Sequence, residues 1–95
     1  VAQVEDFDVR HGLDTRSMLE LFAWDEADFL RRMEGSPIRR IGHEKWLRNL
    51  AVGLGNAAAS MKANEAIVQT LRARLAHPSD LVREHVEWAL AQHGV

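Results

Sequence analysis

The chain has 95 residues, of which 46% are hydrophobic and 27% charged, with a formal net charge of −2. It contains no cysteine, which excludes a disulfide framework, a thiolate zinc site and an iron–sulfur cluster within these residues. No apolar run reaches the roughly 18–20 residues needed to span a bilayer, and the acidic residues 1–10 do not resemble a signal peptide. We therefore expect a cytoplasmic protein with no membrane partner, which is one small domain or, since no initiator Met opens it, a piece of a longer chain.

The sequence predicts an all-α fold of about five helices, because no stretch shows the sustained alternation of a β-strand. Residues 1–13 are expected to form an irregular lead-in, and residues 14–95 a single helical domain. Within this domain, residues 14–56 would contain helices and a basic motif. Residues 57–95 would contain a pair of helices like those of HEAT repeats.

Helix caps and apolar spacing place the first two helices. Asp14 or Thr15 is the expected N-cap of a helix that ends at residue 22 or 23. Asp25 is the expected N-cap of a second helix, which should end at Gly35 because glycine commonly follows a helix C-terminus. The side chains predicted to face the core from these helices are Met18, Leu19, Phe22, Phe29, Leu30 and Met33.

Three further helices follow. One begins between Ile41 and Glu44 and is expected to stop at Gly55-Asn56; a fourth runs from about residue 63 to 76, and a fifth from about residue 80 to 92. Apolar residues recur at helical spacing in all three. The predicted core residues are Leu47, Leu50, Ala51, Leu54, Ile67, Val68, Leu71, Leu75, Val82, Val86, Ala89 and Leu90.

The third and fifth predicted helices are similar in sequence. Arg48 and Arg83 are 35 residues apart, and Leu54 and Leu90 are 36 apart, each in a similar local pattern. A period near forty with two helices per unit is typical of HEAT-type repeats. Two units are fewer than the roughly three that a free-standing solenoid needs, so we expect the chain to dock on another part of a protein or to use its first helices as a cap.

The charges are distributed unevenly. Residues 1–30 carry eight carboxylates and two arginines, residues 31–48 carry six Lys or Arg and two carboxylates, and residues 49–95 carry four groups of each sign. We call residues 31–48 the basic segment. It is either a solvated helix surface or a site for a polyanion such as a nucleic acid, and the charge pattern alone favours neither.

A nucleic acid would find two kinds of contact in this segment. Arginine and lysine side chains suit phosphate oxygens, and the rings of His43 and Trp46 could stack on unpaired bases. The alternative for Trp46 is packing in the core, and the alternative for Arg48 is a bridge between neighbouring repeats. The candidate nucleic-acid-binding residues are Arg39, Arg40, His43, Lys45, Trp46, Arg48 and Asn49.

Neither a metal site nor an active site is predicted. The five histidines are never three or four residues apart on one helix, so none of them forms a ready pair of metal ligands. No nucleophile lies beside a base in a recognisable pattern, and no glycine-rich phosphate loop follows a strand. We therefore expect no catalytic, cofactor-binding or metal-binding residue in this chain.

The residues of three stretches carry a family resemblance. Leu21–Trp24, Phe29–Arg32 and above all Gly35–Asn56 resemble the C-terminal part of the epoxyqueuosine reductase family, and Pro78–Leu90 agrees with its HEAT-like portion. The likeness extends from about residue 14 to 93. The stretch that begins at Gly35 is long and has no simple period, so it is the most specific part of the resemblance.

The resemblance implies a role in tRNA modification. Enzymes of this family reduce epoxyqueuosine to queuosine at the wobble position of tRNA, with cobalamin and two [4Fe–4S] clusters held by upstream domains. The chain would be the C-terminal helical module without the catalytic part, and its partners would be the tRNA anticodon arm and the missing N-terminal catalytic domain. The alternative is a structural module that packs on the catalytic domain without contacting RNA.

Overall fold

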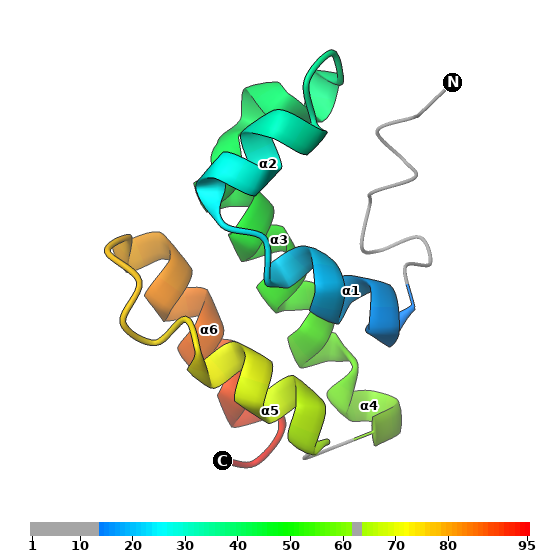
Figure 1. The fold of residues 1–95 in the computed structure, drawn as a ribbon. Helices are drawn as coiled ribbons and strands as arrows, with labels where there is room; N and C mark the ends of the chain where they lie inside the picture. The colour runs from blue at the N-terminus through cyan, green and yellow to red at the C-terminus, as the bar shows by residue number, and fades with distance from the viewer. Residues whose placement is uncertain (1–13, 62–63) are drawn as a thin grey trace.

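The computed structural model describes residues 14–61 and 64–95, and within them it contains helices and turns but no strand (Figure 1). The predicted all-α class is confirmed, and five of the described α-helices have seven or more residues. The predicted lead-in, residues 1–13, lies outside the described residues. The elements are α1 (Thr15–Phe22), α2 (Glu26–Arg32), the 3₁₀ helix η3 (Pro37–Ile41), α3 (Gly42–Asn56), α4 (Ala58–Met61), α5 (Glu65–Arg72) and α6 (Asp80–Gln92).

Polar side chains cap the N-terminal ends of four of the α-helices. The predicted caps Asp14 and Asp25 accept hydrogen bonds from the backbone N–H groups of Ser17 and Asp28, at 2.7 and 2.8 Å. These bonds lower the pKa of both carboxyls below the ordinary value, because each one stabilises the charged form. Asn64 and Ser79 cap α5 and α6 in the same way.

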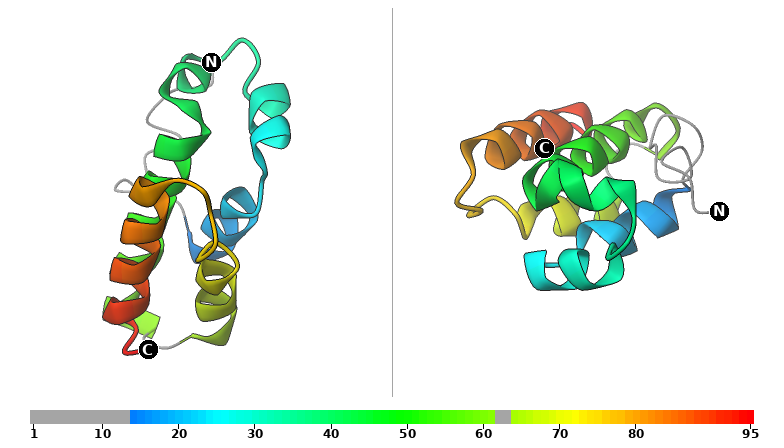
Figure 2. Two further views of the ribbon diagram at one scale, coloured as in Figure 1. Left: turned by 90° about the vertical axis from the view of Figure 1, so that its left-hand side faces the viewer. Right: turned by 90° about the horizontal axis from the view of Figure 1, so that it is seen from above.

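The long helices α3 and α6 lie side by side and run in the same direction (Figure 2). At their N-terminal ends the hydroxyl of Ser79 donates to the carboxylate of Glu44, and at their C-terminal ends His93 Nε2 donates to the carbonyl of Leu54 at 2.8 Å. Between these ends the two helices approach closely. A Cβ atom added at Gly55 would lie 2.5 Å from the Trp88 ring and 3.0 Å from the Ala89 Cα atom.

The predicted end of this helix at Gly55-Asn56 is confirmed, because α3 ends at Asn56. Gly55 is in addition a contact residue between helices. The absence of a side chain at this position allows the backbones of α3 and α6 to pack against each other. A position that indicates a helix C-terminus in the sequence also serves close packing.

A second layer consists of shorter helices. α1 packs on α3 and on α5, and α5 packs on α6. Figure 2 shows α1, α2 and α5 on one side of the α3–α6 pair. The pairs α1–α3 and α5–α6 are thus stacked in the same order, as two units of a helical repeat would be. The assignment of these units to the HEAT type stays a prediction.

The core follows the predicted apolar pattern with two exceptions. Leu30 is 37% exposed and Leu75 is 39% exposed, so both predictions of burial are wrong. α2 has only seven residues and buries Phe29 instead. α5 ends at Arg72, before the predicted end at residue 76, and Leu75 lies in the turns that follow. None of the described helices combines the length and the apolar character that a membrane span requires.

Candidate nucleic-acid interface

The segment between α2 and α3 forms a tight turn followed by η3. Gly35 has a φ of +82°, a left-handed conformation that favours glycine. The hydroxyl of Ser36 accepts a hydrogen bond from the backbone N–H of Ile38 at 3.2 Å, and Pro37 occupies the first position of η3. Ile38 is buried, which anchors η3 on the core and leaves Arg39 and Arg40 at the surface.

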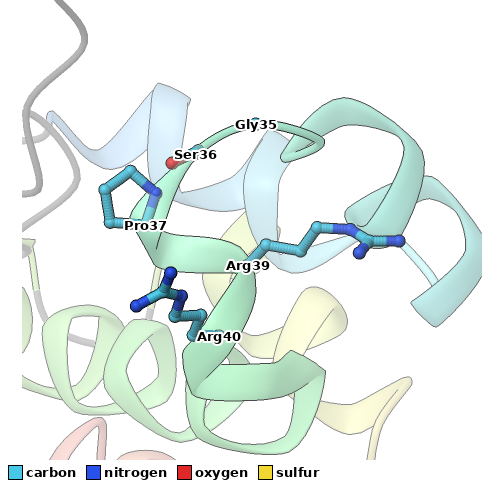
Figure 3. Close-up of a pocket in the computed structure, with 5 residues that line it drawn as sticks. All are labelled: Gly35, Ser36, Pro37, Arg39 and Arg40. Carbon is cyan, nitrogen blue, oxygen red and sulfur yellow. The ribbon is translucent and has the colours of Figure 1, made fainter.

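Arg39 and Arg40 point in different directions from η3 (Figure 3). They line a shallow hollow together with the turn at residues 35–37. Arg39 extends toward α2, where its Nε donates to the carbonyl of Leu30 at 3.0 Å. Arg40 makes no hydrogen bond or ion pair with any described residue. Because the two side chains diverge, each would contact a different phosphate rather than sharing one.

Two further cations lie on α3. Lys45 is exposed and has no hydrogen-bond partner among the described residues. Arg48 is half-buried, and its Nε and Nη2 donate to the side-chain oxygen of Asn49 at 3.2 and 3.0 Å. These bonds stay within α3 and do not bridge to α6. The corresponding Arg83 instead donates to the carbonyl of His77 and to the carboxylate of Asp80.

The two predicted stacking rings lie inside the protein. Trp46 is 3% exposed and His43 is 8% exposed. The Trp46 Nε1 donates to the carbonyl of Leu21 at 3.3 Å, and the His43 Nε2 donates to the carbonyl of Trp24 at 2.8 Å. The structure therefore supports the core interpretation of Trp46, and it removes both rings from the surface that a base could reach.

The structure adds a cation that was not among the candidate contacts. The guanidinium of Arg32 lies over the ring of Trp24, with its Cζ atom 5.1 Å from the ring centroid. Arg32 is exposed and Trp24 is half-buried. Arg32 belongs to the basic segment. Its contact with Trp24 joins the last residue of α2 to the residue that precedes the N-cap of the same helix. No local spacing rule indicates such a contact.

A polar cluster connects this region to the turn between α5 and α6. Arg74 Nη2 donates to the carbonyls of Phe22 and Trp24, at 3.0 and 2.9 Å. The His77 ring lies 6.3 Å from the His43 ring, and its Nδ1 accepts from the Ser79 N–H at 3.0 Å. Burial, followed by the nearby positive charge of Arg74, lowers the pKa of His77. Across residues 14–61 and 64–95, no three His, Asp or Glu side chains could hold a metal ion.

Fold and charge together define the class: an all-α segment with a cationic end and without a metal cluster in its described part. Comparison with known proteins is more specific. The chain is 61% identical over 90 residues to an epoxyqueuosine reductase of Xanthomonas campestris pv. campestris, and 60% identical over 89 residues to one of Pseudomonas aeruginosa. A Burkholderia pseudomallei epoxyqueuosine reductase is 62% identical over 97 residues. The resemblance that the sequence motifs indicated is thus confirmed.

These matches cover nearly the whole chain but only part of each relative. They include 94–95% of this chain and 24% of each of the three relatives, so the chain spans about a quarter of their length. No family model matches the chain, and no solved structure matches it.

Proposed function

We propose that this chain is the C-terminal helical module of an enzyme that reduces epoxyqueuosine to queuosine in tRNA, and that it binds the tRNA anticodon arm. The supporting similarity is high, at 61% identity to one relative, and covers 95% of the chain. The observation that carries the RNA-binding part is the set of exposed cations at η3 and the start of α3, which bond to no carboxylate of the described residues.

The other arginines with acidic neighbours make a useful contrast. Arg31 pairs with Asp28 at 2.7 Å, and Arg83 pairs with Asp80, so these two positive charges are compensated within their own helices. Arg40 and Lys45 have no such partner among the described residues. Uncompensated cations on one side of a domain attract phosphates and release counterions when they bind.

The chemistry of reduction belongs to the rest of the enzyme in this proposal. The family's cobalamin and two [4Fe–4S] clusters need a binding body and cysteine thiolates, and this chain has no cysteine. The donor set present here therefore does not fit an iron–sulfur cluster. The module has no catalytic role of its own, acts in the cytoplasm and docks on the catalytic domain of the same protein.

A second candidate function is a purely structural module that packs on the catalytic domain. Exposed apolar side chains favour it, because Trp88 is 40% exposed and Ile41 is 39% exposed. The bond from Arg39 to the Leu30 carbonyl also shows that one cation of the basic segment already stabilises the fold. Under this alternative the remaining cations would face the catalytic domain and not RNA.

Binding of a labelled tRNA anticodon stem-loop, followed by fluorescence anisotropy at several salt concentrations, tests the two functions. For the chain, we expect affinity to fall steeply between about 50 and 200 mM salt. The double variant Arg40→Ala/Lys45→Ala should bind more weakly, and its log–log salt slope should be smaller by about 1.4–1.8, because two phosphate contacts are lost.

Arg72→Ala provides a matched control for each single replacement, since it removes one exposed cation from α5. It should leave the affinity close to that of the unchanged chain. Absence of binding at low salt would reject the RNA-binding function and favour the structural module. Equal losses in the control and in the Arg40 and Lys45 single variants would show that only overall charge matters.

A further inference from the structure

Arg32, Trp24 and Trp46 form a stack that leads from the core to the surface. The Trp24 and Trp46 rings are nearly parallel, with centroids 5.6 Å apart and an interplanar angle of 13°. Trp46 also packs on the buried ring of Phe29 at 5.1 Å. The guanidinium of Arg32 covers the Trp24 ring at 5.1 Å. The outermost member of this stack is therefore a cation.

The two tryptophans of the stack are held by hydrogen bonds from several parts of the fold. Trp24 lies between α1 and α2, yet its carbonyl accepts from His43 Nε2 on α3 and from Arg74 Nη2 beyond α5, at 2.8 and 2.9 Å. The Trp46 indole is held by its own bond to the carbonyl of Leu21. With its backbone bonded and its ring stacked, Trp24 has little freedom to move. It thus offers a rigid surface to the Arg32 side chain.

The N–H edge of Arg32 is available, in contrast to that of its neighbour. Arg31 donates to the Asp28 carboxylate at 2.7 Å, whereas Arg32 has no hydrogen bond or ion pair with the described residues beyond its contact with Trp24. Because Arg32 donates no hydrogen bond to the described residues, its guanidinium N–H groups remain available to a ligand. These groups form a fork that matches two oxygens of one phosphate.

We propose that Arg32 is a further phosphate contact for the tRNA, and that Trp24 is the residue that positions it. This inference rests on the proposed function. Its location supports it, because Arg39 donates to the carbonyl of Leu30 and so reaches the same end of α2 as Arg32. A side chain already held in place loses little rotational freedom when a phosphate binds, which is the advantage of the stack.

Replacement of Arg32 by lysine tests the inference on the 95-residue chain with the same stem-loop. Lysine keeps the positive charge but loses both the planar fork and the stack. We expect Arg32→Lys to weaken binding about threefold to tenfold with an unchanged salt slope. Arg31→Lys is the matched control, since Arg31 is the adjacent residue of the same helix, and it should change affinity less than about 1.5-fold.

Trp24→Leu removes the positioning ring without changing any charge. Trp24→Leu should also weaken binding of the stem-loop. Combined with Arg32→Lys it should weaken binding little further, because each variant alone already removes the contact between Arg32 and the Trp24 ring. Thermal unfolding shows whether Trp24→Leu loses affinity because the protein is misfolded. Arg32 is exposed, so Arg32→Lys should leave the fold intact and tests the inference even if Trp24→Leu does not fold. Unchanged affinity in Arg32→Lys, or equal losses in Arg31→Lys and Arg32→Lys, would overturn the inference.

The outcome also separates this inference from the proposed function. If Arg40→Ala/Lys45→Ala loses affinity while Arg32→Lys does not, the chain binds RNA but the stacked arginine is not a contact. If the unchanged chain does not bind the stem-loop at low salt, both the function and the inference are rejected.

Discussion

The interface between α3 and α6 and the junction between α2 and η3 are stabilised in different ways. The first is apolar and tightly packed, with a glycine at a point of close approach. The second consists of short helices and depends on side chains that donate to backbone carbonyls, such as those of Trp24 and Leu30. The comparison shows that exposed cations such as Arg39 can be held by hydrogen bonds to carbonyls in a region of short helices, while the apolar core between α3 and α6 stabilises the domain.

Hydrogen bonds to carbonyls suit the second region for a physical reason. Short helices and linkers leave carbonyl groups without partners, and buried unpaired carbonyls are costly. His43 and Arg74 satisfy such groups, and Trp46 adds a bond to the carbonyl of Leu21, which also accepts from the Trp24 N–H. Together these bonds fix the linker between α1 and α2. Among the described residues no buried side-chain nitrogen or oxygen atom lacks a partner.

The largest effect should come from the core between α3 and α6. Leu54 is fully buried on α3, so Leu54→Ala should lower the free energy of unfolding by about 2–5 kcal/mol through lost burial and a residual cavity. Urea denaturation measures this change. Leu30→Ala is the control, because Leu30 is exposed and its truncation should cost less than about 0.5 kcal/mol. Similar losses in the two variants would contradict the contrast between the regions.

Close packing at Gly55 should give the next largest effect. Alanine normally favours a helix over glycine by about 1 kcal/mol, but here the added Cβ would lie 2.5 Å from the Trp88 ring and 3.0 Å from the Ala89 Cα atom. We expect Gly55→Ala to destabilise the fold by about 1–3 kcal/mol.

Combining Gly55→Ala with Trp88→Ala separates the two clashes. Part of the cost of the Gly55 change should disappear when the ring is absent, and the remainder reports the contact with the α6 backbone. A gain in stability for Gly55→Ala alone would mean that α3 and α6 are farther apart than the structure has them.

Local features of this fold could be predicted from the sequence, and contacts across the fold could not. The caps Asp14 and Asp25 depend only on the residues that follow them, and the bounds of α6 were predicted correctly for the same reason. The helix end at Gly55-Asn56 could also be predicted, but the contact that Gly55 makes with Ala89 could not, because Ala89 is distant in sequence. A glycine near a helix end has the same neighbours in the sequence whether or not it also packs against a second helix.

The same limit applies to the candidate interface. Arg40 and Lys45 could be identified because uneven charge is visible in the sequence, and exposed positions tolerate charge. His43 and Trp46 also looked like surface candidates beside those cations, yet the carbonyls of the α1–α2 linker hold both rings inside. Where that linker lies is decided by tertiary packing. The Arg32–Trp24 contact depends on the same packing, so no local pattern of residues indicates it.

A smaller effect is expected where the α6 cap meets α3. The Ser79 hydroxyl accepts from the Val82 N–H and donates to the Glu44 carboxylate. Ser79→Ala should therefore cost about 1 kcal/mol, within the range for loss of an N-cap. Ser79→Asp restores an acceptor for the N–H but places its charge beside Glu44, so it should recover only part of this loss. Full recovery in the aspartate variant would show that the bond to Glu44 contributes nothing to the junction of the two helices.

The smallest predicted effect is a pH dependence that comes from His77. Its pKa is lowered from the ordinary 6.5 by burial first, then by the positive charge of Arg74 and by the neighbouring His43 ring, while Glu44 opposes the shift and Arg83 adds to it. The unfolded chain therefore binds a proton more readily than the folded one just below pH 6.5. The stabilisation should be fully present above that pH and should decrease as the pH falls from there toward the lowered pKa of the folded state.

Replacement of His77 by asparagine isolates this contribution. The amide oxygen of asparagine can accept from the Ser79 N–H, as the ring Nδ1 does, but it does not titrate. Urea denaturation at about pH 7.5 and 5.5 should show a smaller loss of stability on acidification in His77→Asn than in the unchanged chain. An equal loss in both proteins would assign the pH dependence to other groups. It would also mean that the charge on His77 does not disturb the bonds that His43 and Arg74 make to the Trp24 carbonyl. The polar region would then be less sensitive to pH than its dependence on hydrogen bonds implies.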